Sequence, residues 1–205
     1  MQQPLVNTRG ALRLPGKALV WGARTYVAGI VNVTPDSFSG DGRTDAIAAS
    51  DHALALLGQG ADLIDIGAES TRPGHTPVDA RVELMRLLPA LRRLRERAPD
   101  ALVSIDTFKP EVFTAALAAG ADILNSVWGL DDALLEVAAR NRAPVVIMHN
   151  KRVAAYAGDV VDEVLEYLNR HAQRALAAGV PRDHVILDPG IGFGKGPEHN
   201  IALLH

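Results

Sequence analysis

Short apolar runs of strand length recur along this chain, and most give way to polar residues at their carboxyl ends. Segments with apolar residues at helical spacing lie between them, which predicts amphipathic helices. We expect strands at residues 26–31, 63–66, 102–105, 122–124, 144–148 and 184–187. We expect helices at about 45–57, 78–97, 131–140, 160–178 and 198–205, and one more that begins at Pro110, a favoured first-turn residue. Two apolar runs within residues 12–26, around Pro15-Gly16-Lys17, indicate a hairpin or two ahead of this series.

The joint between helix and strand repeats. Residues 60–62, 120–122 and 179–181 each end a predicted helix with glycine and lead into an apolar strand. A repeated βα unit with helical crossovers implies parallel strands, either in an open doubly wound sheet or in a closed barrel. An open sheet gathers its chemistry at one switch point, whereas nearly every strand here ends in polar residues, which favours the barrel.

A closed (β/α)8 barrel needs eight strands, and the pattern supplies about six. We therefore expect an α/β chain whose residues 1–205 form a single TIM-barrel domain, with an N-terminal hairpin and without its C-terminal part. Strand alternation then decides which side chains face the barrel axis. The expected inward set is small or acidic near the carboxyl ends: Ile30, Asn32, Thr34, Asp65, Gly67, Glu69, Ser104, Asp106, Ile123, Asn125, Val146, Met148, Ile186 and Asp188.

The inward acids suggest a ligand. A buried carboxylate without a partner is costly, so Asp106 and Asp188 need a ligand, a cation or a hydrogen-bonding network. Such acids can also cap the next helix, but that role does not explain Asp65, which lies in mid-strand. Several carboxylates and an Asn can bind a flat heterocycle that carries N–H donors. Met148 would then offer an apolar surface to the ring, or simply belong to the core.

The loops add candidates for anion binding. Asn32 is either an oxygen ligand for a hard cation such as Mg²⁺ or a turn former. Arg72, in the loop after the second strand, can present its forked guanidinium to a phosphate. Residues 188–195 are glycine-rich but match neither the dinucleotide fingerprint nor the P-loop. Phe193 and Lys195 could line the mouth of a pocket there or pack against it.

Composition excludes several classes of protein. The 205 residues carry a formal net charge of −3 and no cysteine, so disulfide and thiolate chemistry are excluded. The Arg-rich tract 86–97 alternates with Leu at helical spacing, which indicates a solvated helix face and no nucleic-acid site. No run is long enough to cross a membrane and residues 1–10 lack a signal-peptide core, so we expect a cytoplasmic protein with no membrane partner. The oligomeric state stays open, with a homodimer as one candidate.

Four motifs resemble those of the dihydropteroate synthase family. They are Asn-Val-Thr-Pro-Asp-Ser-Phe at 32–38, Asp-Ile-Gly-Ala-Glu-Ser-Thr-Arg-Pro-Gly at 65–74, Ser-Ile-Asp-Thr at 104–107, and Leu-Asp-Pro-Gly-Ile-Gly-Phe-Gly-Lys at 187–195. The resemblance runs from about residue 27 to the last residue. It implies a transferase that joins 6-hydroxymethyl-7,8-dihydropterin diphosphate to p-aminobenzoate in folate biosynthesis, with Mg²⁺ as cofactor. It also implies that sulfonamides inhibit this enzyme.

The resemblance also implies roles for individual residues. Asn32 resembles the contact to Mg²⁺ near the diphosphate, and Asp106, Asn125 and Asp188 match the residues that recognise pterin. The remaining positions carried over are Met148 against the ring, Thr71 and Arg72 in the loop that meets aminobenzoate and diphosphate, Asp36 and Phe38 in the first mobile loop, and Phe193 near the aminobenzoate ring. Asn32, Asp106, Asp188 and Arg72 are the expected catalytic set.

The chain departs from the family at three places. A later Ser-Arg-Lys strand end and a terminal Arg-x-His are absent, and Ser126 stands where many members carry Asp. These departures keep a second function open, that of a non-catalytic pterin-binding protein derived from the enzyme. A corrinoid methyltransferase that uses methyltetrahydrofolate is a weaker alternative, because it should lack the loops at 34–38 and 70–74.

Overall fold

A computed structural model describes residues 10–34, 42–69 and 77–204, with the backbone alone for residues 42–45. The chain begins with an antiparallel hairpin, β1 (Gly10–Leu14) and β2 (Lys17–Trp21), joined by the two residues Pro15 and Gly16. Gly16 has a φ of 72°, a left-handed conformation that glycine adopts without strain and that suits a tight turn. The prediction of a leading hairpin is confirmed.

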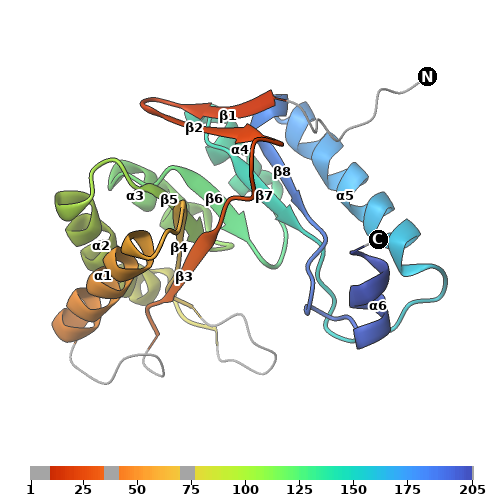
Figure 1. The fold of residues 1–205 in the computed structure, drawn as a ribbon, viewed down its shortest axis with the longest axis horizontal. Helices are drawn as coiled ribbons and strands as arrows, with labels where there is room; N and C mark the ends of the chain where they lie inside the picture. Colours follow the sequence, from red (N-terminus) through yellow and green to blue (C-terminus); the bar gives the residue numbers. More distant parts are fainter. Residues whose placement is uncertain (1–9, 35–41, 70–76, 205) are drawn as a thin grey trace.

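Six parallel strands follow in sequence order, β3-β4-β5-β6-β7-β8 (Figure 1). Their bounds are β3 Ala28–Asn32, β4 Leu63–Gly67, β5 Leu102–Asp106, β6 Ile123–Ser126, β7 Val145–Met148 and β8 Val185–Asp188. A doubly wound sheet reverses its strand order at a switch point, and this sheet never does. The order is that of six consecutive units of a (β/α)8 barrel wall, as predicted.

A helix connects each strand to the next. The helices are α1 Gly42–Gly58, α2 Ala80–Arg97, α3 Pro110–Ala118, α4 Asp132–Asn141 and α5 Val160–Ala177, with a short 3-10 turn η1 Arg182–His184 and a last helix α6 Pro197–Ala202. The last helix ends before the predicted residue 205. Strand β6, the fourth of the parallel strands, begins at Ile123, one residue later than predicted, because Asp122 turns away to bind Lys17 and Arg95.

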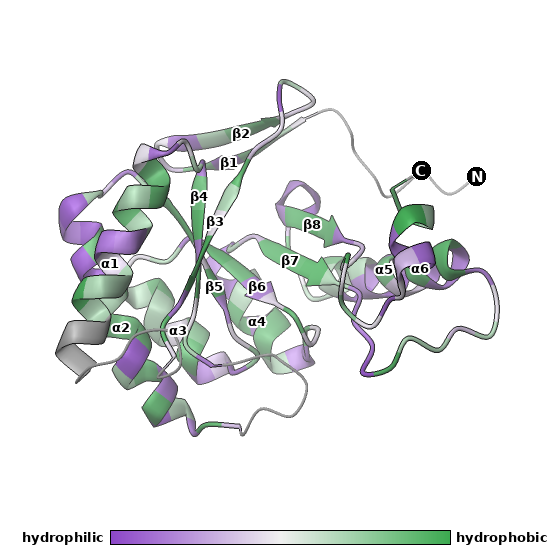
Figure 2. Ribbon diagram, turned by 60° about the horizontal axis from the view of Figure 1, so that its bottom comes forward, coloured by the Kyte–Doolittle hydropathy of each residue, from purple (hydrophilic) through white to green (hydrophobic). Residues whose placement is uncertain are grey.

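One large apolar core lies between the sheet and the helices. Ile64, Ile66, Val103 and Ile105 from the outer face of the sheet are at most 1% exposed. They pack with the apolar faces of α1 to α5, whose hydrophilic positions lie away from the strands (Figure 2). Burying this much apolar surface is what holds the wall together.

A second, smaller core closes the amino ends of the strands. Leu12 and Leu19 of the hairpin pack against Leu102 and Ile123, with Leu63, Val146 and Ile186 around them. The hairpin therefore forms the floor of the barrel interior. The predicted acids and amides of the inner face, Asn32, Asp65, Asp106 and Asn125, lie above this floor.

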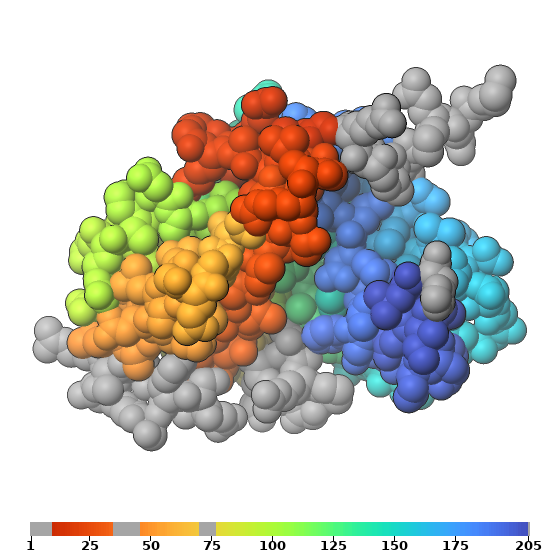
Figure 3. All heavy atoms as spheres, in the orientation of Figure 1, coloured from red at the N-terminus to blue at the C-terminus, as the bar shows by residue number. Residues whose placement is uncertain are grey.

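The wall is open between β3 and β8, which are the two outer strands of the described sheet. Ile30, on the inner face of β3, is 62% exposed. Figure 3 shows the surface recessed between the segment that carries β3 and the C-terminal segment, with mid-chain atoms visible deeper inside. Within the described residues, no helix is both long and apolar enough to cross a membrane.

Candidate active site

The register of the strands brings the predicted polar residues to one level. Asn32 pairs with Gly67, Gly67 with Asp106, and Asp106 with Asn125, all at the carboxyl ends of β3 to β6. On the far side of the wall, Met148 pairs with Asp188. Carboxyl ends of parallel strands are where barrel enzymes hold their chemistry, and the sequence prediction of this row is confirmed in its placement.

Gly67 leaves room in the middle of this row. A Cβ added at Gly67 would lie 3.6 Å from Asn32 Oδ1 and 3.8 Å from Asp106 Oδ2. The Asn32 and Asp106 oxygens therefore flank a residue that has no side chain of its own. A larger side chain would extend into the space that these oxygens border.

Asp65 and Asp106 form a pair of acids on the inner face. Asn125 Nδ2 donates to Asp65 Oδ2 at 3.1 Å, and the Val127 amide donates to Asp106 Oδ1 at 3.4 Å. Burial raises the pKa of Asp106 to about 7, and the charge of Asp65 adds to the effect. Burial also raises the pKa of Asp65, and the neighbouring side chains of Ser104 and Asn125 oppose that rise. No cation among the described residues offsets either acid in these shifts.

Asp188 is held differently from the other two acids. Its Oδ1 accepts a hydrogen bond from the Gly190 amide at 2.7 Å, and its carbonyl accepts one from the His149 amide at 3.0 Å. Its neighbour Met148 is 4% exposed, in agreement with a buried apolar surface beside the row. Phe193 is 38% exposed in the loop that follows.

Lys195 does not line a pocket mouth. The side chain is buried, and Nζ lies within 3.2 Å of His149 Nδ1 and of the carbonyls of His149, Gly190 and Phe193. Gly190 has a φ of 70°, and a Cβ there would lie 2.0 Å from the His149 carbonyl oxygen. Of the two alternatives for Lys195, packing is correct: this lysine fixes the glycine-rich loop against the end of β7.

A buried ion cluster just beyond the end of β4 was not predicted. Lys109 Nζ binds Glu83 Oε2 at 2.7 Å and also binds Glu69, whose Oε1 accepts from the Val78 amide at 3.0 Å. The expectation that Glu69 joins the inward row is therefore wrong, because β4 ends at Gly67 and Glu69 turns toward Lys109. The burial of Glu83 could have been inferred from the sequence, because Glu83 shares the apolar face of its helix with Leu87 and Leu94.

Magnesium has a limited set of protein ligands here. The described residues contain no group of three or more His, Cys, Asp or Glu side chains that could hold a metal ion. Asn32 Oδ1 is an oxygen of the right kind at the rim, close to Asp106. Mg²⁺ is commonly held by one or two protein oxygens together with substrate phosphates and water. The residues therefore fit an ion that arrives with a phosphate better than a resident one.

Four predicted site residues, Asp36, Phe38, Thr71 and Arg72, lie outside the described residues.

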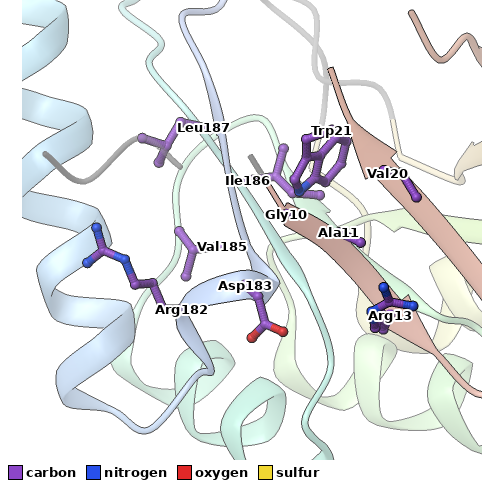
Figure 4. Close-up of a pocket in the computed structure, with 10 residues that line it drawn as sticks. All are labelled: Gly10, Ala11, Arg13, Val20, Trp21, Arg182, Asp183, Val185, Ile186 and Leu187. Carbon is purple, nitrogen blue, oxygen red and sulfur yellow. The ribbon is translucent and has the colours of Figure 1, made fainter. Parts of the chain in front are cut away.

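A groove of about 670 Å³ lies away from the predicted site, between the hairpin and β8 at the opposite end of the strands (Figure 4). Its lining includes Trp21, Ile186 and Asp183, but none of the predicted site residues. The predicted residues at the carboxyl ends of the strands are therefore separate from this groove.

Comparison with known proteins agrees with this geometry. A dihydropteroate synthase of Streptococcus pyogenes serotype M6 is 45% identical over 192 residues, which cover 92% of this chain and 71% of the relative. The structure of Xanthomonas albilineans dihydropteroate synthase with 4-aminobenzoic acid is 45% identical, with a TM-score of 0.88 over 96% of this chain and 72% of that one. The same enzyme in complex with 7,8-dihydropteroate is 42% identical, with a TM-score of 0.84 over 95% of this chain and 71% of that one. Residues 28–205 match the model of the pterin binding enzyme family, and this chain belongs to that family.

Proposed function

We propose that this protein is a dihydropteroate synthase, a transferase that condenses 6-hydroxymethyl-7,8-dihydropterin diphosphate with p-aminobenzoate in folate biosynthesis. The observation that carries the proposal is the row of acceptor side chains at the carboxyl ends of the strands, on a chain 45% identical to a protein of that name. The Xanthomonas albilineans relative holds 7,8-dihydropteroate and 4-aminobenzoic acid in its structures. The products are 7,8-dihydropteroate and diphosphate.

The pterin ring is recognised by acceptors. Asp106, Asn125 and Asp188 supply carboxylate and amide oxygens, and a pterin edge supplies the N–H donors that match them. Met148 offers its buried thioether to the face of the ring. A ring that donates hydrogen bonds favours the ionised form of an acceptor, so binding is expected to lower the raised pKa of Asp106.

The diphosphate lies at the rim. Asn32 Oδ1, at the carboxyl end of β3, would hold Mg²⁺ together with the substrate. When bound, the ion neutralises charge on the departing diphosphate. Thr71 and Arg72 belong to the loop that meets the anion, where the guanidinium can bind two oxygens at once.

The second substrate enters beside the glycine-rich loop. Phe193, exposed in that loop, is the aromatic residue we assign to the p-aminobenzoate ring, with Asp36 and Phe38 in the first loop. The arylamine nitrogen attacks the methylene carbon, the carbon–oxygen bond to diphosphate breaks, and the amine loses a proton. The protein holds the two partners in line and excludes water, which would otherwise capture the methylene carbon. Sulfonamides should compete with p-aminobenzoate at this position.

Product formation tests the proposal. The protein is mixed with both substrates and Mg²⁺, and diphosphate and 7,8-dihydropteroate are measured. Release of both in equal amounts supports the synthase. Pterin binding without any release, by protein shown to be folded, would favour the non-catalytic binder instead. The chain spans 71% of the length of the Streptococcus pyogenes relative.

Two substitutions separate the ring from the anion. Asp188→Ala should abolish pterin binding and leave the fold intact, and retained affinity would contradict the assigned role. Arg72→Ala should weaken the diphosphate substrate far more than the free pterin alcohol, and equal losses would argue against an anion contact. A homodimer and a cytoplasmic location stay predictions, which light scattering and cell fractionation would test.

A further inference from the structure

One acid on the inner face has no part in the proposed reaction. Asp65 lies in the middle of β4, above the apolar floor, and pairs in register with Ser104 on β5. It is one level below the row of Asn32, Gly67, Asp106 and Asn125. Burying a carboxylate there costs free energy unless a neighbouring group hydrogen-bonds to it.

The neighbour that hydrogen-bonds to Asp65 is Asn125. Asn125 Nδ2 donates to Asp65 Oδ2 at 3.1 Å, across two strands and 60 residues of sequence. A carboxylate oxygen accepts and does not donate, so the Asn125 nitrogen must turn toward it. The Asn125 carbonyl oxygen then points the other way, toward the row at the carboxyl ends of the strands.

We propose that Asp65 is a positioning residue that fixes the orientation of the Asn125 amide, so that Asn125 presents an acceptor and not a donor to the ligand. This inference rests on the proposed function, because it concerns how the same site reads its substrate. With Asn125 so turned, Asn125 joins Asp106 and Asp188 as a third acceptor. The site then selects a ring edge that donates hydrogen bonds at all three places.

Protonation of Asp65 does not undo this orientation. Among the described residues, Asp65 Oδ1 and Ser104 Oγ are both buried without a hydrogen-bond partner, whereas Asp65 Oδ2 is bound to Asn125. A proton on the acid would therefore reside on Oδ1, where Ser104 offers an acceptor. Oδ2 would still accept from Asn125.

The side-chain amide of Asn125 reports the contact directly. In ¹⁵N NMR spectra of the ligand-free protein, its two protons should give separate signals that exchange slowly with water, identified by their loss in Asn125→Asp. In Asp65→Asn, whose own amide can face Asn125 either way, the signals should shift and exchange faster. Fast exchange in the wild-type protein, or unchanged signals in the variant, would overturn the inference.

Binding gives the second readout. Asp65→Asn should lower affinity for 6-hydroxymethylpterin by about tenfold or more, the effect of freeing one buried hydrogen-bonding group. Asp51→Asn makes the same chemical change at an exposed ion pair on α1 and should leave affinity unchanged. Equal affinity of Asp65→Asn and the wild type would contradict the inference.

The two proposals fail separately. If the wild-type protein does not bind 6-hydroxymethylpterin, the proposed function is wrong, and the Asn125 signals still decide whether Asp65 orients that amide. If the wild type binds the pterin and Asp65→Asn leaves both the affinity and the signals unchanged, the inference alone is wrong. The wild-type spectrum also decides the matter should Asp65→Asn fail to fold.

Discussion

The aspartates at the amino ends of the strands lie against cations, whereas Asp106, on the inner face at the carboxyl ends, is influenced by the charge of another aspartate, Asp65. Asp122 binds Lys17 at 2.8 Å and Arg95 at 2.6 Å. The hydrogen bond from Arg24 lowers the pKa of Asp62 to about 2. At the other end, burial and Asp65 raise the pKa of Asp106 to about 7.

This difference distinguishes acids that stabilise the fold from acids that we expect to bind a ligand. A paired acid with a lowered pKa stabilises the folded state at neutral pH. An acid with a raised pKa destabilises it, and such residues gather where a protein binds or reacts. The hairpin closes the first end with apolar side chains, while the second end keeps its oxygens accessible to a ring.

The ion cluster of Lys109 gives the largest expected effect, since it lies near the carboxyl ends yet both of its acids bind a cation. Lys109→Met should destabilise the fold by about 3–5 kcal/mol, because it leaves Glu69 and Glu83 buried without their cation. Urea unfolding measures the change. Arg140→Met, at an exposed ion pair with Glu136, is the matched control and should cost less than about 0.5 kcal/mol.

Asp122 is the test of the amino end. Asp122→Asn should cost about 2 kcal/mol of stability, because Lys17 and Arg95 lose their counter-ion and the Val103 amide a charged acceptor. Pterin affinity should not change. Asp132→Asn, whose carboxylate is 94% exposed beside Arg174, is the control for the same chemical change. A loss of pterin affinity in Asp122→Asn, with the fold intact, would contradict the division between the two ends.

Substitution of Asp106 is expected to raise the stability of the fold, whereas substitution of Asp122 lowers it. The pKa of Asp106 is 3.8 in the unfolded chain and about 7 in the folded one, so the folded state binds more protons between these values. Its contribution to stability is therefore present below 3.8 and is lost as the pH rises toward about 7. Asp106→Asn should remove that loss and stabilise the protein above this range by about 1–2 kcal/mol, while pterin binding falls. Chemical unfolding at several pH values checks both the sign and the window.

Replacing Lys195 is expected to destabilise one loop and not the whole fold. Lys195→Met should leave the carbonyls of His149, Gly190 and Phe193 without their shared donor, at a cost of about 1–3 kcal/mol. Hydrogen exchange should rise in residues 188–196 and stay unchanged in the hairpin. Uniform loss of protection across the whole sheet would show that this lysine supports more than its loop.

Much of the fold follows from patterns that are local in sequence. Strand alternation has a period of two, so it assigned Asn32, Asp106 and Asn125 to one face, and the register then brought them to one level. The Pro15-Gly16 turn between apolar runs was enough to predict the hairpin. Repeated βα joints predicted parallel strands in sequential order.

Contacts between distant side chains could not be predicted in the same way. Lys109 meets Glu83 across 26 residues and Glu69 across 40, and only the packing of α2 against the sheet decides that meeting. Lys195 reaches His149 across 46 residues, because two glycines let the loop approach the backbone after β7. The contact of Asp65 with Asn125 likewise depends on strand register, which no single strand encodes.

The most direct measurement is a crystal structure of the protein soaked with 6-hydroxymethyl-7,8-dihydropterin diphosphate and Mg²⁺. We predict the ring among Asp106, Asn125 and Asp188, beside Met148, with the diphosphate near Asn32. A ring bound in the groove between the hairpin and β8, or anywhere else away from those three acceptors, would contradict the account.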